Sequence, residues 1–186
     1  MSAAASAARS LGAVEWPANL SAVHFIKLEL RDGDGKQVSE NFYWRALPEH
    51  QDNLKGLGDL PKVMLDAKVV RREVEGKSFF DLTLRNPGNQ IALMAHVQLR
   101  RKDSGQRVLP VYYSDNYVSL VPTESKTITI EAASSELKGK TAVVLVDGWN
   151  VGVAVSSAPG VELDLNVGAQ VDHWPVTGLP IISSAK

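Results

Sequence analysis

Cysteine is absent from the 186-residue sequence, which excludes disulfides, thiolate metal sites and cysteine nucleophiles. Aromatic residues amount to 6% and the formal net charge is -1, so the chain offers no basic surface to nucleic acid or to an anionic membrane. Long apolar runs are also missing: no segment reaches the ~20 residues of a membrane span, and the N-terminal residues lack the apolar core of a signal peptide. The length falls short of the about 250 residues that a (β/α)₈ barrel needs, which speaks against a large catalytic scaffold.

Alternating apolar and polar residues dominate the middle of the chain. Segments 80–84 and 91–99 show this period of two clearly, and turn-forming residues follow each of them. Residues 142–146 form a continuous apolar run, which is typical of a central strand buried on both faces. Short strands at regular spacing predict an all-β fold, an immunoglobulin-like antiparallel β-sandwich over residues 62–168.

The remaining segments are assigned by the same patterns. Residues 22–45 alternate on either side of an Asp-Gly-rich turn and predict a β-hairpin, which either packs on the sandwich or belongs to a neighbouring domain. Residues 46–61 are rich in turn formers and predict a linker. We expect a flexible lead-in at 1–21 and a loose tail at 169–186.

Residue patterns that carry catalysis or bind cofactors are missing. No Gly-x-Ser-x-Gly elbow or phosphate-binding glycine loop occurs, and none of the four histidines has a second histidine at metal-ligand spacing. The segment Asp32 to Gly35 lacks the further oxygen ligands of a calcium loop and is interpreted as a hairpin turn. We therefore predict no catalytic residue, no cofactor and no metal ion for this chain.

Two aromatic-rich segments are the candidates for an interface or a sugar contact. Their rings could stack on a sugar while the neighbouring polar groups form hydrogen bonds, or they could form the packed corner of a sheet, where Asp and Asn cap a turn. The candidate residues are Tyr112, Tyr113, Asp115, Asn116, Tyr117, Trp149 and Asn150.

Three segments carry a resemblance to a known enzyme family. Residues 28–44 resemble the closing hairpin of an Ig-like domain in glycoside hydrolase family 2, in its exo-β-D-glucosaminidase, β-mannosidase and endo-β-mannosidase branch. Residues 80–92 and 107–125 resemble the next Ig-like domain of the same enzymes. The order Pro, Ser-Asp-Asn-Tyr, Leu, Pro-x-Glu-Ser within 110–125 is the most specific part, and Thr123 departs from the glycine that the family has there.

The resemblance implies a non-catalytic C-terminal accessory region of an enzyme that acts on β-mannosides or β-glucosaminides. Residues 22–45 would then close a preceding Ig-like domain, and residues 62–168 would be the terminal sandwich. The two catalytic glutamates of the family lie on a barrel that no part of this sequence matches. The expected partners are the other domains of the parent glycosidase, which would be periplasmic or secreted.

Two alternatives stay open. In the first, the sandwich is a carbohydrate-binding module whose exposed Tyr and Trp rings stack on an oligosaccharide. In the second, the unpaired edges of the hairpin at 22–45 associate with another copy of the chain and form a dimer.

Overall fold

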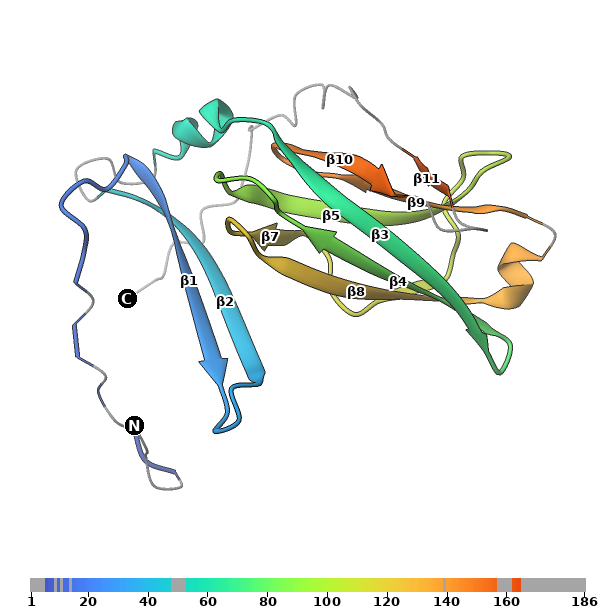
Figure 1. Cartoon of the computed structure of the whole chain (residues 1–186), viewed down its shortest axis with the longest axis horizontal. Coiled ribbons are helices and arrows are strands. Elements are labelled where there is room, and N and C mark those ends of the chain that lie inside the picture. The colour runs from blue at the N-terminus through green and yellow to red at the C-terminus, as the bar shows by residue number, and fades with distance from the viewer. Residues whose placement is uncertain are drawn as a thin grey trace, which may run out of the picture. The chain divides into compact units, whose positions relative to one another are not determined.

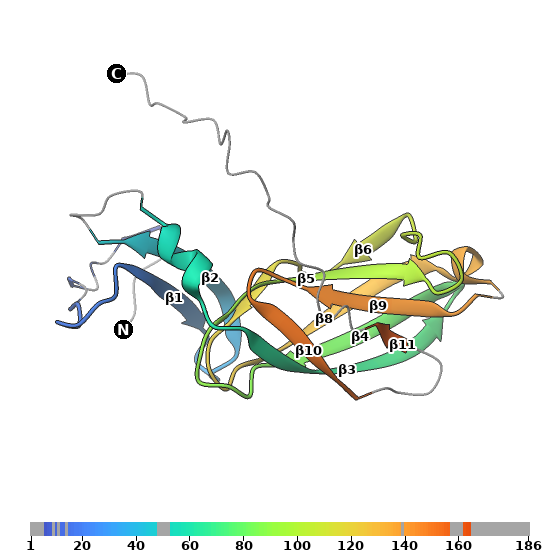
Figure 2. The same ribbon diagram turned by 90° about the horizontal axis from the view of Figure 1, so that it is seen from above.

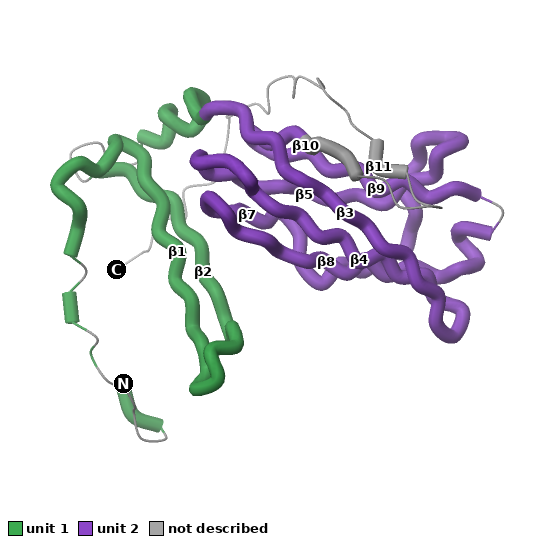
Figure 3. Tube along the Cα trace, in the orientation of Figure 1, with its two compact units in different colours: residues 1–60 green, residues 61–186 purple. Residues whose placement is uncertain are grey.

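The computed structural model describes residues 6–8, 10, 12–13, 15–47, 53–138, 140–156 and 162–164. Two compact units, residues 1–60 and residues 61–186, make up the chain and are considered separately (Figure 3). The predicted tail at 169–186 lies outside the described residues, whereas the described part of the lead-in contains turns but no helix or strand. Within the described ranges, no helix has the length and apolar character needed to cross a bilayer.

A two-stranded antiparallel hairpin forms the first unit, with strands β1 (Val23–Arg31) and β2 (Gln37–Ala46). Its turn is fixed by Asp32, whose Oδ1 accepts backbone N–H bonds from Asp34 at 3.1 Å and Lys36 at 2.9 Å. Gly35 has a φ of 82°, a conformation that glycine adopts without steric cost. Within the predicted linker, residues 55–59 form the short 3₁₀ helix η2 (Lys55–Asp59), in which Leu57 is buried.

Two facing sheets form the second unit (Figures 1 and 2). The first sheet has the strand order β10-β3-β4-β8-β6 and the second has the order β11-β9-β5-β7. The strands of the first sheet are β3 (Val63–Val74), β4 (Lys77–Arg85), β6 (Val111–Tyr113), β8 (Ser125–Ala133) and β10 (Val151–Ser156). Those of the second are β5 (Ala92–Arg101), β7 (Val118–Leu120), β9 (Ala142–Asp147) and β11 (Glu162–Asp164), and the 3₁₀ helix η3 (Ser134–Leu137) follows β8.

Alternation along the strands places one apolar row of each sheet in the shared core. On β4 the residues Phe80, Leu82 and Leu84 are completely buried, and on β5 the residues Val97 and Leu99 face them with 1% exposure. The prediction of an all-β, immunoglobulin-like sandwich is therefore confirmed. Its pairings are antiparallel except that β10 runs parallel to β3 and β11 runs parallel to β9.

The neighbouring valines of β3 test this core directly. Val69 is fully buried in the core, whereas Val70 points to the opposite face and is 48% exposed. Val69→Ala is expected to lower the free energy of unfolding by about 2 kcal/mol, because it removes two buried methyl groups and leaves a cavity. Val70→Ala should change it by less than about 0.5 kcal/mol. Urea denaturation of both variants measures the difference, and equal effects would contradict the assigned faces of β3.

Candidate functional site

The segment between β6 and β7 carries the chain from one sheet to the other, and together with β6 it contains five of the seven predicted site residues. Tyr112 lies opposite Glu131 on the outer face of the first sheet and is 68% exposed. Tyr113 points the other way and packs against the core, where its hydroxyl accepts a bond of 3.0 Å from the backbone N–H of Leu99. Burial raises the pKa of Tyr113 above its usual value.

Asn116 joins this corner to strand β5. Its Oδ1 accepts the N–H of Val97 at 2.8 Å and the N–H of Tyr117 at 2.9 Å, while its Nδ2 donates to the carbonyl of Val97 at 3.0 Å. Asp115 precedes it and accepts the N–H of Asn116, and a 2.7 Å ion pair with Lys126 holds the carboxylate in place. The polar groups of Asp115 and Asn116 therefore fix the corner, as expected for a turn capped by these residue types.

Tyr117 has a ring that is exposed but not isolated. The residue is 56% exposed, and its ring stacks on that of His96 with a centroid distance of 4.5 Å and an interplanar angle of 13°. The Nδ1 atom of His96 lies 2.8 Å from Oδ1 of Asp147, which is the directly paired residue on β9. The three side chains thus form a row from β9 across β5 to the residue before β7, which we call the Tyr117–His96–Asp147 row.

Asn150 is a structural residue of the sandwich with an exposure of only 2%. Its Oδ1 accepts the N–H of Leu93 at 2.8 Å, and its Nδ2 donates to the carbonyls of Pro61 at 2.7 Å and Ile91 at 2.9 Å. These three bonds engage both Oδ1 and Nδ2 of the side chain, and the buried amide has no surface that a ligand could contact. Trp149 precedes it with 44% exposure, and its N–H donates to the carbonyl of Leu93 at 3.1 Å.

The structure therefore separates the predicted residues into different environments. Tyr117 lies on the outer face of the second sheet, Tyr112 on the outer face of the first sheet, and Asn150 inside the sandwich. Sequence reasoning missed His96 and Asp147 as neighbours of Tyr117. Period two placed His96 on the outer side of its strand, but the pairing of β5 with β9 depends on register between segments far apart in the sequence.

The Tyr117–His96–Asp147 row has too few metal-ligating groups to form a zinc site. His96 and Asp147 supply one nitrogen and one carboxylate, whereas zinc sites use three or four protein ligands. The remaining neighbour, Gln98, places its Nε2 at 3.3 Å from the same ring nitrogen of His96. The row is thus an aromatic surface bordered by a carboxylate.

Comparison with known proteins gives a consistent match for this fold and these segments. The family described as the exo-β-D-glucosaminidase Ig-fold domain matches residues 41–151. The exo-β-D-glucosaminidase of Streptomyces avermitilis is 36% identical over an alignment of 149 residues, and the match covers 70% of this chain and 16% of that protein. The exo-β-D-glucosaminidase of Amycolatopsis orientalis is 31% identical over an alignment of 159 residues, and the match covers 76% of this chain and 15% of that protein.

A solved structure agrees with these sequence matches. The crystal structure of the Amycolatopsis orientalis exo-chitosanase CsxA superimposes with a TM-score of 0.66 and 29% identity, covering 74% of this chain and 18% of that one. The chain thus spans about a sixth of the length of the two relatives that it matches in sequence.

Replacement of Asn150 tests its structural role. Asn150→Ala leaves the buried Leu93 N–H and two carbonyls without partners, and we expect it to lower the free energy of unfolding by about 3 kcal/mol. Asn89→Ala, at an exposed position of a turn, is the matched control and should cost less than about 0.5 kcal/mol. Chemical denaturation compares the two, and an unchanged midpoint for Asn150→Ala would contradict the assignment.

Alkaline titration tests the environment of Tyr113. Since burial raises its pKa, the folded state favours the neutral phenol, and this contribution to stability is complete below pH ~10 and is lost as pH rises through the folded-state pKa. Ultraviolet absorbance should show, in the folded protein, a phenol that ionises at a higher pH than a free tyrosine does. Tyr113→Phe should remove that step, and its persistence in the variant would show that another tyrosine is responsible.

Proposed function

The chain belongs to the exo-β-D-glucosaminidase Ig-fold domain family of glycoside hydrolase family 2 enzymes, and from this premise we propose that it is a non-catalytic accessory region of an enzyme acting on β-glucosaminides. The names of the two relatives favour β-glucosaminides over β-mannosides as the parent's substrates. The observation that carries the proposal is that the sandwich matches only a small share of each relative, while its candidate polar residues bind its own backbone. The catalytic residues would then lie in the part of the parent that this chain does not match.

The hairpin supports a role within a larger protein. Opposed residues on antiparallel strands share a face, so Ile26 and Tyr43 lie on the same side of the hairpin as Leu28 and Leu30. Leu28 is 52% exposed, Leu30 is 60% exposed and Tyr43 is 47% exposed. A row of exposed large apolar residues on two strands is unfavourable in water and marks a surface that another protein segment covers.

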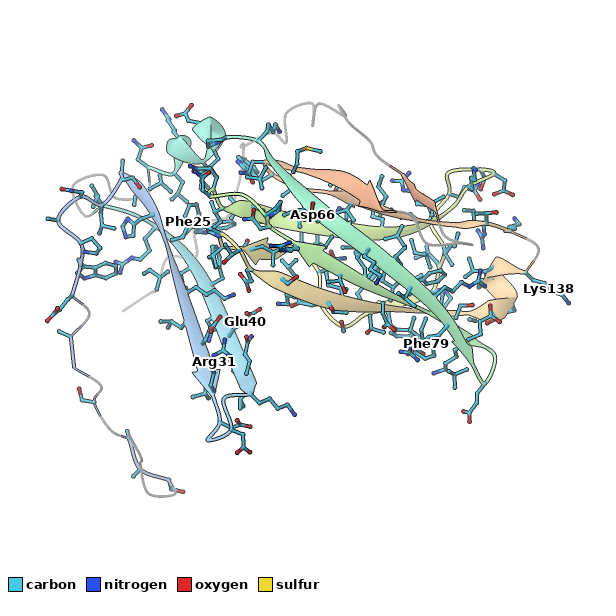
Figure 4. The ribbon with its side chains drawn as sticks, in the orientation of Figure 1. Phe25, Arg31, Glu40, Asp66, Phe79 and Lys138 are labelled. Carbon is cyan, nitrogen blue, oxygen red and sulfur yellow. The ribbon has the colours of Figure 1, made fainter. Side chains whose placement is uncertain are left out.

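The other face of the hairpin has its own internal contacts. Phe25 and Phe42 stack with ring centroids 5.7 Å apart, and Lys27 lies 3.4 Å from Glu40 and from Glu29. Figure 4 marks Phe25 and Glu40 on the two strands. Because these side chains already have partners, the face with Leu28 and Leu30 is the one that is available to another domain.

A buried imidazole on strand β1 of the hairpin supports the same role. His24 is only 9% exposed, and its Nδ1 has no hydrogen-bond partner among the described residues, although its ring packs edge-on against Trp16. An unpaired buried nitrogen is unfavourable, and a neighbouring domain could supply the missing partner. We therefore propose that residues 22–45 close an Ig-like domain whose other strands belong to the parent enzyme, with pairing between two copies of the chain as the alternative.

A chimera tests the accessory role. We expect the purified chain alone to release no product from an aryl β-D-glucosaminide. When this chain replaces the matching segment of the Streptomyces avermitilis enzyme, the chimera should hydrolyse that substrate. The same enzyme with the segment deleted should lose activity at least about tenfold or fail to fold, because an uncovered domain surface is destabilising. Full activity after the deletion, or turnover by the isolated chain, would contradict the proposal.

A charge on the apolar face tests the hairpin. Leu30→Asp should leave the melting temperature of the free chain unchanged, because Leu30 is exposed there. In the chimera the same substitution should cost about 2 kcal/mol or more, because it would bury an unpaired carboxylate. Leu109→Asp, at a leucine with 68% exposure in the sandwich, is the matched control. Equal melting temperatures for both chimeric variants would refute the docking of this face.

A further inference from the structure

We propose that the Tyr117–His96–Asp147 row binds a saccharide unit that carries an ammonium group, so that the accessory sandwich holds an amino-sugar chain. Neither the match to the family nor the relatives' names assign such a site to these residues. The choice of saccharide rests on the proposed function, whereas the position of the site rests on the geometry of the row.

The first argument is the presentation of the Tyr117 ring. One side of the ring stacks on His96 in a nearly parallel arrangement, yet the residue remains 56% exposed. A tyrosine that served only to fill the corner would be covered, as Tyr113 on β6 is where it packs against the core. An exposed, supported aromatic face is the surface on which the C–H groups of a pyranose ring pack.

The second argument is rigidity. Asn116 bonds to the N–H of Tyr117 and to both backbone polar groups of Val97, so the residue before the ring is attached to β5. His96 directly precedes Val97 on that strand, and its ring is held by the 2.8 Å contact of its Nδ1 with Oδ1 of Asp147. Both members of the stack are therefore fixed before a ligand arrives, which reduces the entropy lost on binding.

The third argument is backbone strain. Tyr117 has a φ of 55°, and Met94 in β5 has a φ of 54°, although neither is glycine. Met94 lies within the irregular register between Ala92 and Ala95, where β5 pairs with β7. Left-handed conformations of large side chains are unfavourable, and both these and β-bulges concentrate where a fold must aim a side chain.

The fourth argument is the negative charge of Asp147, whose carboxylate lies beside the His96 ring. The side chain of Asp147 is 43% exposed, and only its Oδ1 contacts His96 among the contacts that the structure gives it. An ammonium group on a pyranose stacked against Tyr117 would be attracted by the π face of the ring, and the Asp147 carboxylate beside His96 adds a negative charge to the same row. A neutral sugar could use the ring but not the charge, so the row favours an amino sugar.

Titration with a defined oligosaccharide tests the site. The probe is the fully deacetylated hexasaccharide of β-1,4-linked glucosamine, added to the full chain and followed by NMR shifts of the aromatic rings and backbone. Tyr117→Ala should weaken binding about two- to fivefold, since a ring–cation contact at an exposed site is lost. Asp147→Asn should weaken it about two- to fivefold and reduce its salt dependence.

Matched residues in the same chain supply the controls. Tyr112→Ala removes a more exposed tyrosine from the other sheet, and Asp66→Asn removes an exposed carboxylate from β3 (Figure 4); both should bind as the unaltered chain does. Tyr117→Phe keeps the stacked ring and should stay within about twofold, so it tests the site even if Tyr117→Ala does not fold. The fully N-acetylated hexasaccharide should bind more weakly than the deacetylated one.

Several outcomes would overturn the inference. They are an absence of binding by the unaltered chain, equal losses in the Tyr117 and Tyr112 variants, and equal affinity for the acetylated and deacetylated probes. The chimera experiment separates this failure from that of the proposed function. An active chimera with no saccharide bound at Tyr117 would retain the accessory role and remove only the site.

Discussion

Burial of one apolar row from each sheet is the constraint on which the rest of this molecule depends. Phe80 and Leu82 on β4 face Val97 and Leu99 on β5, and neither row can leave the other without exposing completely buried side chains. The chain must therefore cross between the two sheets several times. Each crossing interrupts the ladder of backbone hydrogen bonds and leaves polar groups that need other partners.

Asparagine side chains supply many of those partners. Asn116 lies in the crossing between β6 and β7 and bonds to the backbone of Val97 on β5, and Asn150 lies between β9 and β10 and bonds to the backbone of Leu93 on β5. Asn86, after β4, donates to the carbonyls of Gln90 at 2.8 Å and Leu120 at 3.0 Å. A carboxamide both donates and accepts, so it can replace a strand backbone at a place where no strand is available. The asparagine side chains near the corners of the sandwich thus serve mainly to hold the backbone in place.

The strands and their buried faces can be predicted from the sequence, because they depend on residues that are close together in the chain. Period two in segments such as 80–84 predicts strands and their buried faces, and the family resemblance predicts the sandwich that the structure confirms. Long-range pairings are different, because nothing near His96 indicates that Asp147 lies opposite it on another strand. The burial of Asn150 cannot be predicted from the sequence either, since an Asp-Gly-Trp-Asn segment has the composition of an exposed turn. Register and burial are properties of the assembled sheets.

The two parts of the chain differ in how far their groups are satisfied. In the described part of the sandwich, the asparagine side chains at the corners are paired and the apolar residues form one buried core. In the hairpin, leucines are exposed and the Nδ1 of the buried His24 has no hydrogen-bond partner among the described residues. An accessory region needs both properties: a unit stable enough to serve as a support, and a surface that becomes stable only against its neighbour. Tyr117 differs from these paired groups, because its ring is exposed and is also held in place by the stack with His96. A ring that is both exposed and rigid loses little entropy when it contacts a ligand.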